Sequence, residues 1–215
     1  MVTMIQKSTS KKITHKSIPK KPMPQRIHVD RKDFERIGKE MELFEKRRED
    51  IIAKAHEIIR FSKKVIYGIQ REDEISSLIS SMNLKIKNLR TRGELQFTSF
   101  YKTAMQEYVE AICLYEVLKS KKLPTQIELQ VSAPDYLSGL CDLTGELMRK
   151  ANNLALKGNT KDAIMIKELV DDIYGEILSL DIRDNDLRKK ADQIKYNLRK
   201  LEDLAISIIR RSSRH

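Results

Sequence analysis

Apolar residues recur at spacings of three and four along most of the chain, and this pattern predicts helices. The first such run begins after Asp30, a residue suited to cap a helix, and continues to the region of Gly68. A helix of more than about 35 residues, or roughly 55 Å, extends beyond one small core, so its apolar face is expected to contact other subunits. The apolar positions of this run are Phe34, Ile37, Met41, Phe44, Ile51, Ile52, Ala55, Ile58, Ile59, Val65, Ile66 and Ile69.

The same periodicity continues to the end of the chain. The third run places Phe97 and Phe100 on its buried side, and the fourth begins at a capping Ser132. Gly139 and Gly145 lie inside the fourth run, where each costs about 1 kcal/mol relative to Ala, so another backbone or a ligand is expected to approach closely there. A loop or short crossover is expected over residues 123–131. Helices are expected over residues 73–90, 94–121, 132–157, 160–180 and 184–208.

No segment alternates apolar and polar residues for long enough to predict a strand. The seven Gly and five Pro leave few turns, which favours few and long elements. The fold class predicted is therefore all-α, a long-helix α-α superhelical bundle of about six to seven helices. Residues 29–215 are expected to form a single helical domain, preceded by a basic N-terminal tail over residues 1–28.

The net charge of +11 is concentrated at the N-terminus. Residues 1–28 hold seven Lys and Arg and no acid, and they have too little apolar surface to pack. This tail either attracts nucleic acid, directs nuclear import or only improves solubility. The overall charge suits a polyanionic partner.

Targeting signals and cysteine usage favour a cytoplasmic location, with the nucleus as the alternative. There is no 18-residue apolar run and no signal-peptide core, so no membrane association is expected. Cys113 and Cys141 lack zinc-site spacing and lie in apolar helical runs. Both are predicted to be buried, reduced thiols.

Two pairs of acids stand out as candidate chemistry. Glu107 and Glu110 are three residues apart, and Asp142 and Glu146 are four apart on the next long run, so each pair shares one helix face. Carboxylates without His or Cys suit Mg²⁺, Mn²⁺ or Ca²⁺ rather than zinc. Such an ion can activate water for attack on a phosphodiester and offset charge on the leaving oxygen.

The alternative explanation of these acids is that they only solvate the surface, since the chain contains 31 acids. Their position beside the apolar stripe favours a bound cation, because clustered and partly buried acids repel one another unless they are protonated or neutralised. The four His form no pair, and no phosphate-binding Gly-rich loop occurs.

A basic run leads directly into the acidic helix. Most such runs are only solvated faces, but this position favours contact with phosphates. The residues predicted to form a basic surface that contacts nucleic-acid phosphates are Lys85, Lys87, Arg90, Arg92 and Arg149.

Two motifs carry a family resemblance. They are Gln-Glu-Tyr-Val-Glu-Ala over residues 106–111 and Asp-Tyr-Leu-Ser-Gly-Leu-Cys-Asp-Leu-Thr-Gly-Glu-Leu-Met-Arg over residues 135–149. Together they resemble the translin family, and specifically its translin-associated factor X branch, over roughly residues 30–210. The connection between the third and fourth long helices is shorter here than in eukaryotic factor X proteins.

This resemblance implies an all-helical subunit of a hollow octameric shell that binds single-stranded RNA or DNA. The factor X branch supplies a metal-dependent endoribonuclease acting on single-stranded or nicked RNA inside the shell. By position, Glu107, Glu110 and Asp142 match the family's acids, and Glu146 is the expected companion. The subunit is expected to assemble with itself, with a translin-like partner as the alternative.

The function predicted is therefore a Mg²⁺-dependent endoribonuclease with Glu107, Glu110, Asp142 and Glu146 as catalytic and metal-binding residues. One alternative is an oligomer that binds single-stranded nucleic acid without cutting it. Another is a structural or adaptor assembly whose acids only keep it soluble.

Overall fold

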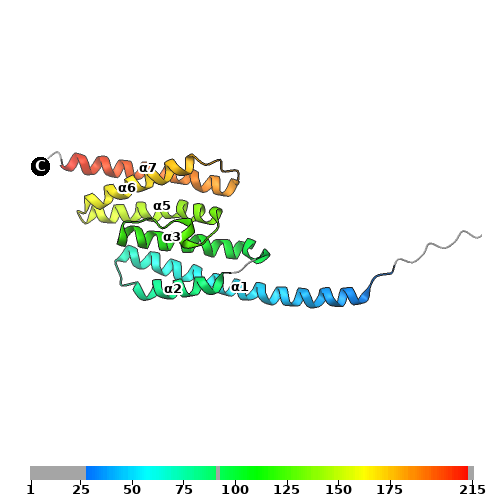
Figure 1. Cartoon of the computed structure of the whole chain (residues 1–215). Helices are drawn as coiled ribbons and strands as arrows, with labels where there is room; N and C mark the ends of the chain where they lie inside the picture. Colours follow the sequence, from blue (N-terminus) through cyan, green and yellow to red (C-terminus); the bar gives the residue numbers. More distant parts are fainter. Residues whose placement is uncertain (1–27, 91–92, 213–215) are drawn as a thin grey trace, which may run out of the picture. The chain divides into compact units, whose positions relative to one another are not determined.

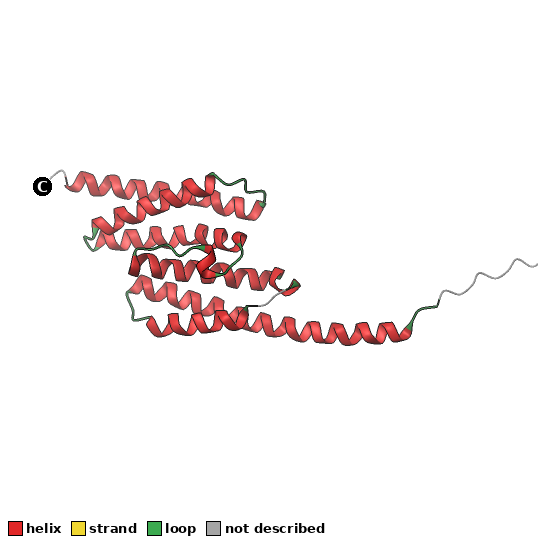
Figure 2. Ribbon diagram, viewed as in Figure 1, coloured by secondary structure: helices red, strands yellow, loops and turns green. Residues whose placement is uncertain are grey.

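The computed structural model describes residues 28–90 and 93–212. In this part of the chain all regular structure is helical and no strand occurs, which confirms the all-α prediction (Figure 2). No helix among these residues has both the length and the apolar content needed to cross a membrane. The helices are α1 Arg31–Arg71, α2 Ser76–Leu89, the 3-10 helix η1 Glu94–Phe97, α3 Ser99–Ser120, α4 Gln126–Leu129, α5 Ala133–Leu156, α6 Thr160–Leu178 and α7 Asn185–Ser212.

The chain divides into two compact units, Met1–Glu40 and Met41–His215. In the first unit α1 begins where expected, because the Asp30 carboxylate accepts a hydrogen bond from the backbone N–H of Lys32 at 2.9 Å. Its apolar side chains Phe34 and Ile37 are exposed. The predicted basic tail lies outside the described residues apart from its last residue.

In the second unit α5 is the central helix. It packs against α3, α6 and α7, and α6 also packs against α7 (Figure 1). One apolar cluster joins these helices to α1 and α2. Its largest fully buried side chains are Ile58, Val65, Met82, Ile86, Leu89, Met105, Leu114, Leu143, Leu147, Ile166, Ile194 and Leu201.

Several predicted helix boundaries differ from the structure: α2 begins at Ser76 instead of residue 73, and α7 ends at Ser212 instead of residue 208. Two further differences have a clear physical cause. Helix α1 continues through Gly68, where a Cβ would lie 2.5 Å from Ile75 Cγ2, so glycine is needed for the chain to fold back over the helix. The third helix begins at Ser99 because Thr98 is extended. As a result the prediction that Phe97 is buried was wrong, since 67% of it is exposed, and Phe100 is also exposed.

The two cysteines are confirmed as buried free thiols. Burial raises the pKa of Cys113 and of Cys141 to about 12, so both remain protonated at neutral pH.

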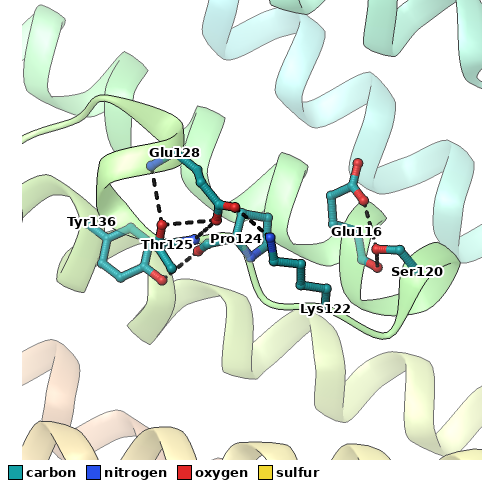
Figure 3. A network of polar contacts seen from close by, with 7 residues as sticks. All are labelled: Glu116, Ser120, Lys122, Pro124, Thr125, Glu128 and Tyr136. Atoms are coloured by element: carbon teal, nitrogen blue, oxygen red, sulfur yellow. Dashed lines mark hydrogen bonds and ion pairs between the residues drawn. The ribbon is translucent and has the colours of Figure 1, made fainter.

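The connection between α3 and α5 contains a one-turn helix instead of an open loop (Figure 3). Thr125 and Glu128 form a capping box, and the Lys122 ammonium lies 2.5 Å from Glu128. Lys122 and the Thr125 donors lower the pKa of Glu128 to about 2. The Tyr136 hydroxyl donates to the Pro124 carbonyl at 2.7 Å, so this connection is tied to the start of α5.

The end of α1 is tied to α5 by a buried lysine. Lys150 is 6% exposed, and its ammonium donates to the Ile69 carbonyl at 3.1 Å and to Glu72 at 3.2 Å. Lys157 contacts the same Glu72 carboxylate at 2.6 Å but is itself exposed.

Replacing Lys150 with Met is expected to lower the free energy of unfolding by about 2 kcal/mol, because the Ile69 carbonyl loses a charged donor in a buried place. Lys157→Met is the matched control, and its expected effect is below about 0.5 kcal/mol because its ion pair is solvated. Urea unfolding followed by circular dichroism measures both values. Equal effects of the two substitutions would contradict the proposed role of Lys150.

Candidate metal and nucleic-acid site

Helices α3 and α5 approach each other closely at Gly139, as the sequence predicted for that residue. A Cβ at Gly139 would lie 2.7 Å from Val109 Cβ and 2.8 Å from the Gln106 carbonyl oxygen. The segment of α3 that carries both glutamates therefore lies directly against α5. Gly145 differs, since the nearest atom to a Cβ there would be Asn197 Nδ2 at 3.7 Å, so no close approach requires that glycine.

This packing brings the two predicted acidic pairs together. Glu107 and Glu110 of α3 and Asp142 and Glu146 of α5, which together we call the acidic cluster, are all partly buried. Asp142 raises the pKa of both Glu107 and Glu110, and Glu146 raises that of Glu110. The charges of the two helices therefore act on one another across the interface.

Glu110 is the most perturbed acid of the cluster. Burial is the main cause that raises its pKa to about 8, and the charges of Asp142, Glu107 and Glu146 add to this effect. Burial is also the main cause that raises the pKa of Glu107. The Lys63 ammonium, 3.8 Å away, lowers this pKa and partly offsets the effect of burial.

The acids other than Glu110 have partners from distant parts of the chain. The Lys190 ammonium of α7 lies 2.5 Å from Asp142. The Gln70 side-chain amide of α1 donates to the Glu146 carboxylate at 2.8 Å. Each of these contacts fixes one carboxylate beside Glu110.

The acidic cluster offers carboxylate oxygens, which are the ligands that hard divalent cations prefer. As the side chains are placed, no three His, Cys, Asp or Glu within the described ranges could jointly hold a metal ion. Lys190 already provides one cation at Asp142. The cluster is thus a carboxylate site in which part of the charge is balanced by lysine.

Stability should depend on pH through Glu110. Its pKa is about 8 in the folded chain and near the ordinary 4.5 when unfolded, so the folded state holds this proton more tightly. The free energy of unfolding of the wild type should therefore fall, relative to that of Glu110→Gln, as the pH rises from about 4.5 to 8. Above about pH 8 the difference between the two proteins should be constant.

Thermal unfolding of the wild type and Glu110→Gln, measured without divalent ions from pH 5 to pH 9, tests this expectation. If Mg²⁺ binds the ionised cluster, it should raise the midpoint more at pH 8.5 than at pH 5.5. Parallel curves for the two proteins would contradict the shifted pKa.

The five residues predicted to form the basic surface differ in their exposure and in their ion-pair partners. Arg149 lies 3.6 Å from Glu146 and is exposed. Lys85 pairs with Glu57 at 2.7 Å, and Lys87 is exposed on α2. Arg92 lies outside the described residues.

Arg90 has a structural role besides lining a pocket beside the cluster. Its guanidinium donates to the Leu129 carbonyl at 2.9 Å and to the Gln130 side chain, so it joins the end of α2 to the α4–α5 connection.

Sequence reasoning did not find Lys190, Gln70 or Lys63. Lys190 is 48 residues from Asp142 and Gln70 is 76 residues from Glu146, so no local spacing connects them. Gln106, whose side-chain oxygen accepts from the Lys190 ammonium at 3.3 Å, lies in the first motif but was not among the predicted site residues.

Comparisons with known proteins point to one family. A model of the Translin family matches residues 34–211. An uncharacterized protein of Methanocaldococcus jannaschii is 29% identical, covering 67% of this chain and 68% of that protein. Translin-associated protein X of Pongo abelii is 22% identical, covering 84% and 78%.

Solved structures show the same fold. The crystal structure of AfC3PO has a TM-score of 0.70 and 28% sequence identity, covering 81% of this chain and 96% of that chain. A structure of AfC3PO in complex with duplex RNA has a TM-score of 0.66 and 24% identity, covering 81% and 95%.

Proposed function

Because this chain belongs to the translin family, we propose that it is an RNA-binding oligomer that hydrolyses RNA phosphodiester bonds with the help of a divalent cation. The observation that carries the proposal is the convergence of two acidic pairs on Glu110, whose pKa is raised to about 8 by burial and by the other three acids. Clusters of this kind are typical of sites that bind cations or transfer protons.

Mg²⁺ is the proposed ion. The four acids would hold it only after their side chains rearrange, because no three of them are placed to hold an ion jointly in the described residues. The chemistry that such an ion supplies is an acidified water and compensation of charge on the leaving oxygen. Among the chain's own groups, Glu110 is suited to accept a proton near neutral pH. Lys190 places a positive charge beside Asp142, where a phosphate could be held.

Oligomer formation is proposed from the exposed apolar side chains of α1. Phe34 is 63% exposed and Ile37 is 38% exposed, although both continue the apolar periodicity of the helix. An apolar stripe of this kind favours contact with another subunit. The relative AfC3PO, which has been solved with duplex RNA, supports RNA as the polyanionic partner. Single-stranded RNA is the proposed substrate.

The test is cleavage of a fluorescently labelled single-stranded RNA by the purified full chain, with its native mass measured in parallel. Internal cuts are expected with Mg²⁺ and should disappear on adding a chelator and return with excess Mg²⁺. Binding of the RNA without cleavage under Mg²⁺, Mn²⁺ or Ca²⁺ would instead support the non-catalytic binding oligomer. A monomer that neither binds nor cuts would exclude both functions.

A further inference from the structure

A pocket of about 920 Å³ lies beside the acidic cluster. It is bordered by η1, the beginning of α3, the α4–α5 connection and the beginnings of α5 and α7. Its volume falls within the range of sites that hold small molecules. The residues that matter for its chemistry are Phe97, Lys102, Gln106, Asp135, Ser138 and Lys190.

The inner wall of the pocket is a fixed polar network. The Gln106 side-chain amide donates to Asp135 at 3.1 Å, and its oxygen accepts from Ser138 at 3.0 Å and from Lys190 at 3.3 Å. Asp135 is 4% exposed and also accepts from the Ser132 hydroxyl at 2.6 Å. The amide and ammonium therefore have defined positions in the wall.

The pocket and the acidic cluster share one side chain. The Lys190 ammonium lines the pocket and lies 2.5 Å from Asp142. Gln106 directly precedes Glu107 on α3. A ligand in the pocket would thus be separated from the cluster by little more than this lysine.

The outer part of the pocket combines an aromatic ring with charges of both signs, because the carboxylates of Asp184 and Asp186 line the pocket together with its basic side chains. Phe97 lines the pocket and is 67% exposed, although burying a phenylalanine side chain away from water lowers the free energy. Lys102, one turn into α3, is exposed and lines the same pocket. An aromatic platform beside cations suits a base and a phosphate of an unpaired nucleotide, because stacking tolerates every base.

We infer that this pocket binds one unpaired nucleotide of the RNA, next to the phosphodiester that lies at the acidic cluster. Phe97 stacks on the base, Lys102 and Lys190 attract phosphate, and the Gln106–Asp135–Ser138 network forms the polar floor. The inference rests on the proposed function, since the nucleotide is part of the RNA to be cut. It would favour a single strand, because a base held in a pair is not free to stack on Phe97.

Binding of AMP to the full chain without divalent ions tests the inference, by isothermal titration calorimetry or by NMR. AMP is expected to bind more tightly than adenosine or inorganic phosphate. Phe97→Ala and Lys102→Ala should each weaken AMP binding by at least about fivefold. The matched controls, Leu156→Ala and Lys161→Ala, alter exposed residues outside the pocket and should leave AMP affinity unchanged.

Several results would overturn the inference: no binding of AMP at millimolar concentration, equal affinity for phosphate and AMP, or equal AMP affinity of pocket and control variants. The assay detects no cleavage, so its outcome is separate from that of the proposed function. RNA cleavage in a chain that binds no AMP would reject only the pocket. AMP binding that depends on Phe97, in a chain that never cuts RNA, would reject only the nuclease.

Discussion

Replacing Glu110 with Gln is expected to reduce Mg²⁺-dependent cleavage of single-stranded RNA by at least about 100-fold, because the change removes the group best suited to accept a proton near neutral pH. The amide keeps the shape of the side chain and removes a charge that is unfavourable where it is buried. The fold should therefore persist, and its stability at pH 8 should increase. Single-turnover cleavage with saturating enzyme measures the chemical step.

Glu116→Gln is the matched control for this experiment. Glu116 lies on the same helix, but its carboxylate accepts locally from the Ser120 hydroxyl at 2.8 Å and takes no part in the acidic cluster (Figure 3). The cleavage rate of Glu116→Gln should stay within about twofold of the wild-type rate, because surface substitutions away from a site have little effect on the fold. RNA affinity should be similar in both variants. A Glu110→Gln protein that cleaves at the wild-type rate would remove Glu110 from the mechanism.

The second large effect concerns the packing of α3 on α5. Gly139→Ala is expected to lower the free energy of unfolding by about 2 kcal/mol, because the added methyl group overlaps Val109 and the Gln106 carbonyl oxygen. The substitution should also slow RNA cleavage, since separation of the two helices moves Glu107 and Glu110 away from α5. Urea unfolding and the cleavage assay on the same preparation measure both effects.

Gly175→Ala on α6 provides the opposite expectation. A Cβ there would meet no atom within 4 Å, so the methyl group costs nothing and the helix gains about 1 kcal/mol from the better helix former. The two Gly→Ala changes should thus have opposite signs. If Gly139→Ala also stabilises the protein, the close contact between α3 and α5 is not a constraint on the fold.

The predicted helices correspond closely to those observed, because helix formation leaves a local and periodic trace in the sequence. Ser132 caps α5, accepting from the Asp135 N–H at 3.3 Å, and Asp184 accepts from Leu187 N–H at 2.8 Å at the start of α7. Ser132 was predicted as a cap, and the last helix was predicted to begin at residue 184. The failure at η1 has an equally local cause, since Phe97 continues the apolar spacing although the extended Thr98 interrupts the helix.

The motifs identified the acids, but their environment depends on packing. The spacing of Glu107 and Glu110, and of Asp142 and Glu146, already placed each pair on one helix face. Their mutual effect on pKa required α3 to lie against α5, which depends on Gly139.

By itself the sequence determined the all-helical class, most helix ends and the identity of the two acidic pairs, since each of these follows from residues less than two turns apart. The tertiary structure alone decided which side chains surround those acids and where a neighbouring pocket opens. Lys190 and Gln70 reach the acidic cluster across 48 and 76 residues of chain. The physical reason is that helical periodicity specifies which face of a helix is apolar, whereas the partner of that face is selected by the packing of the whole core.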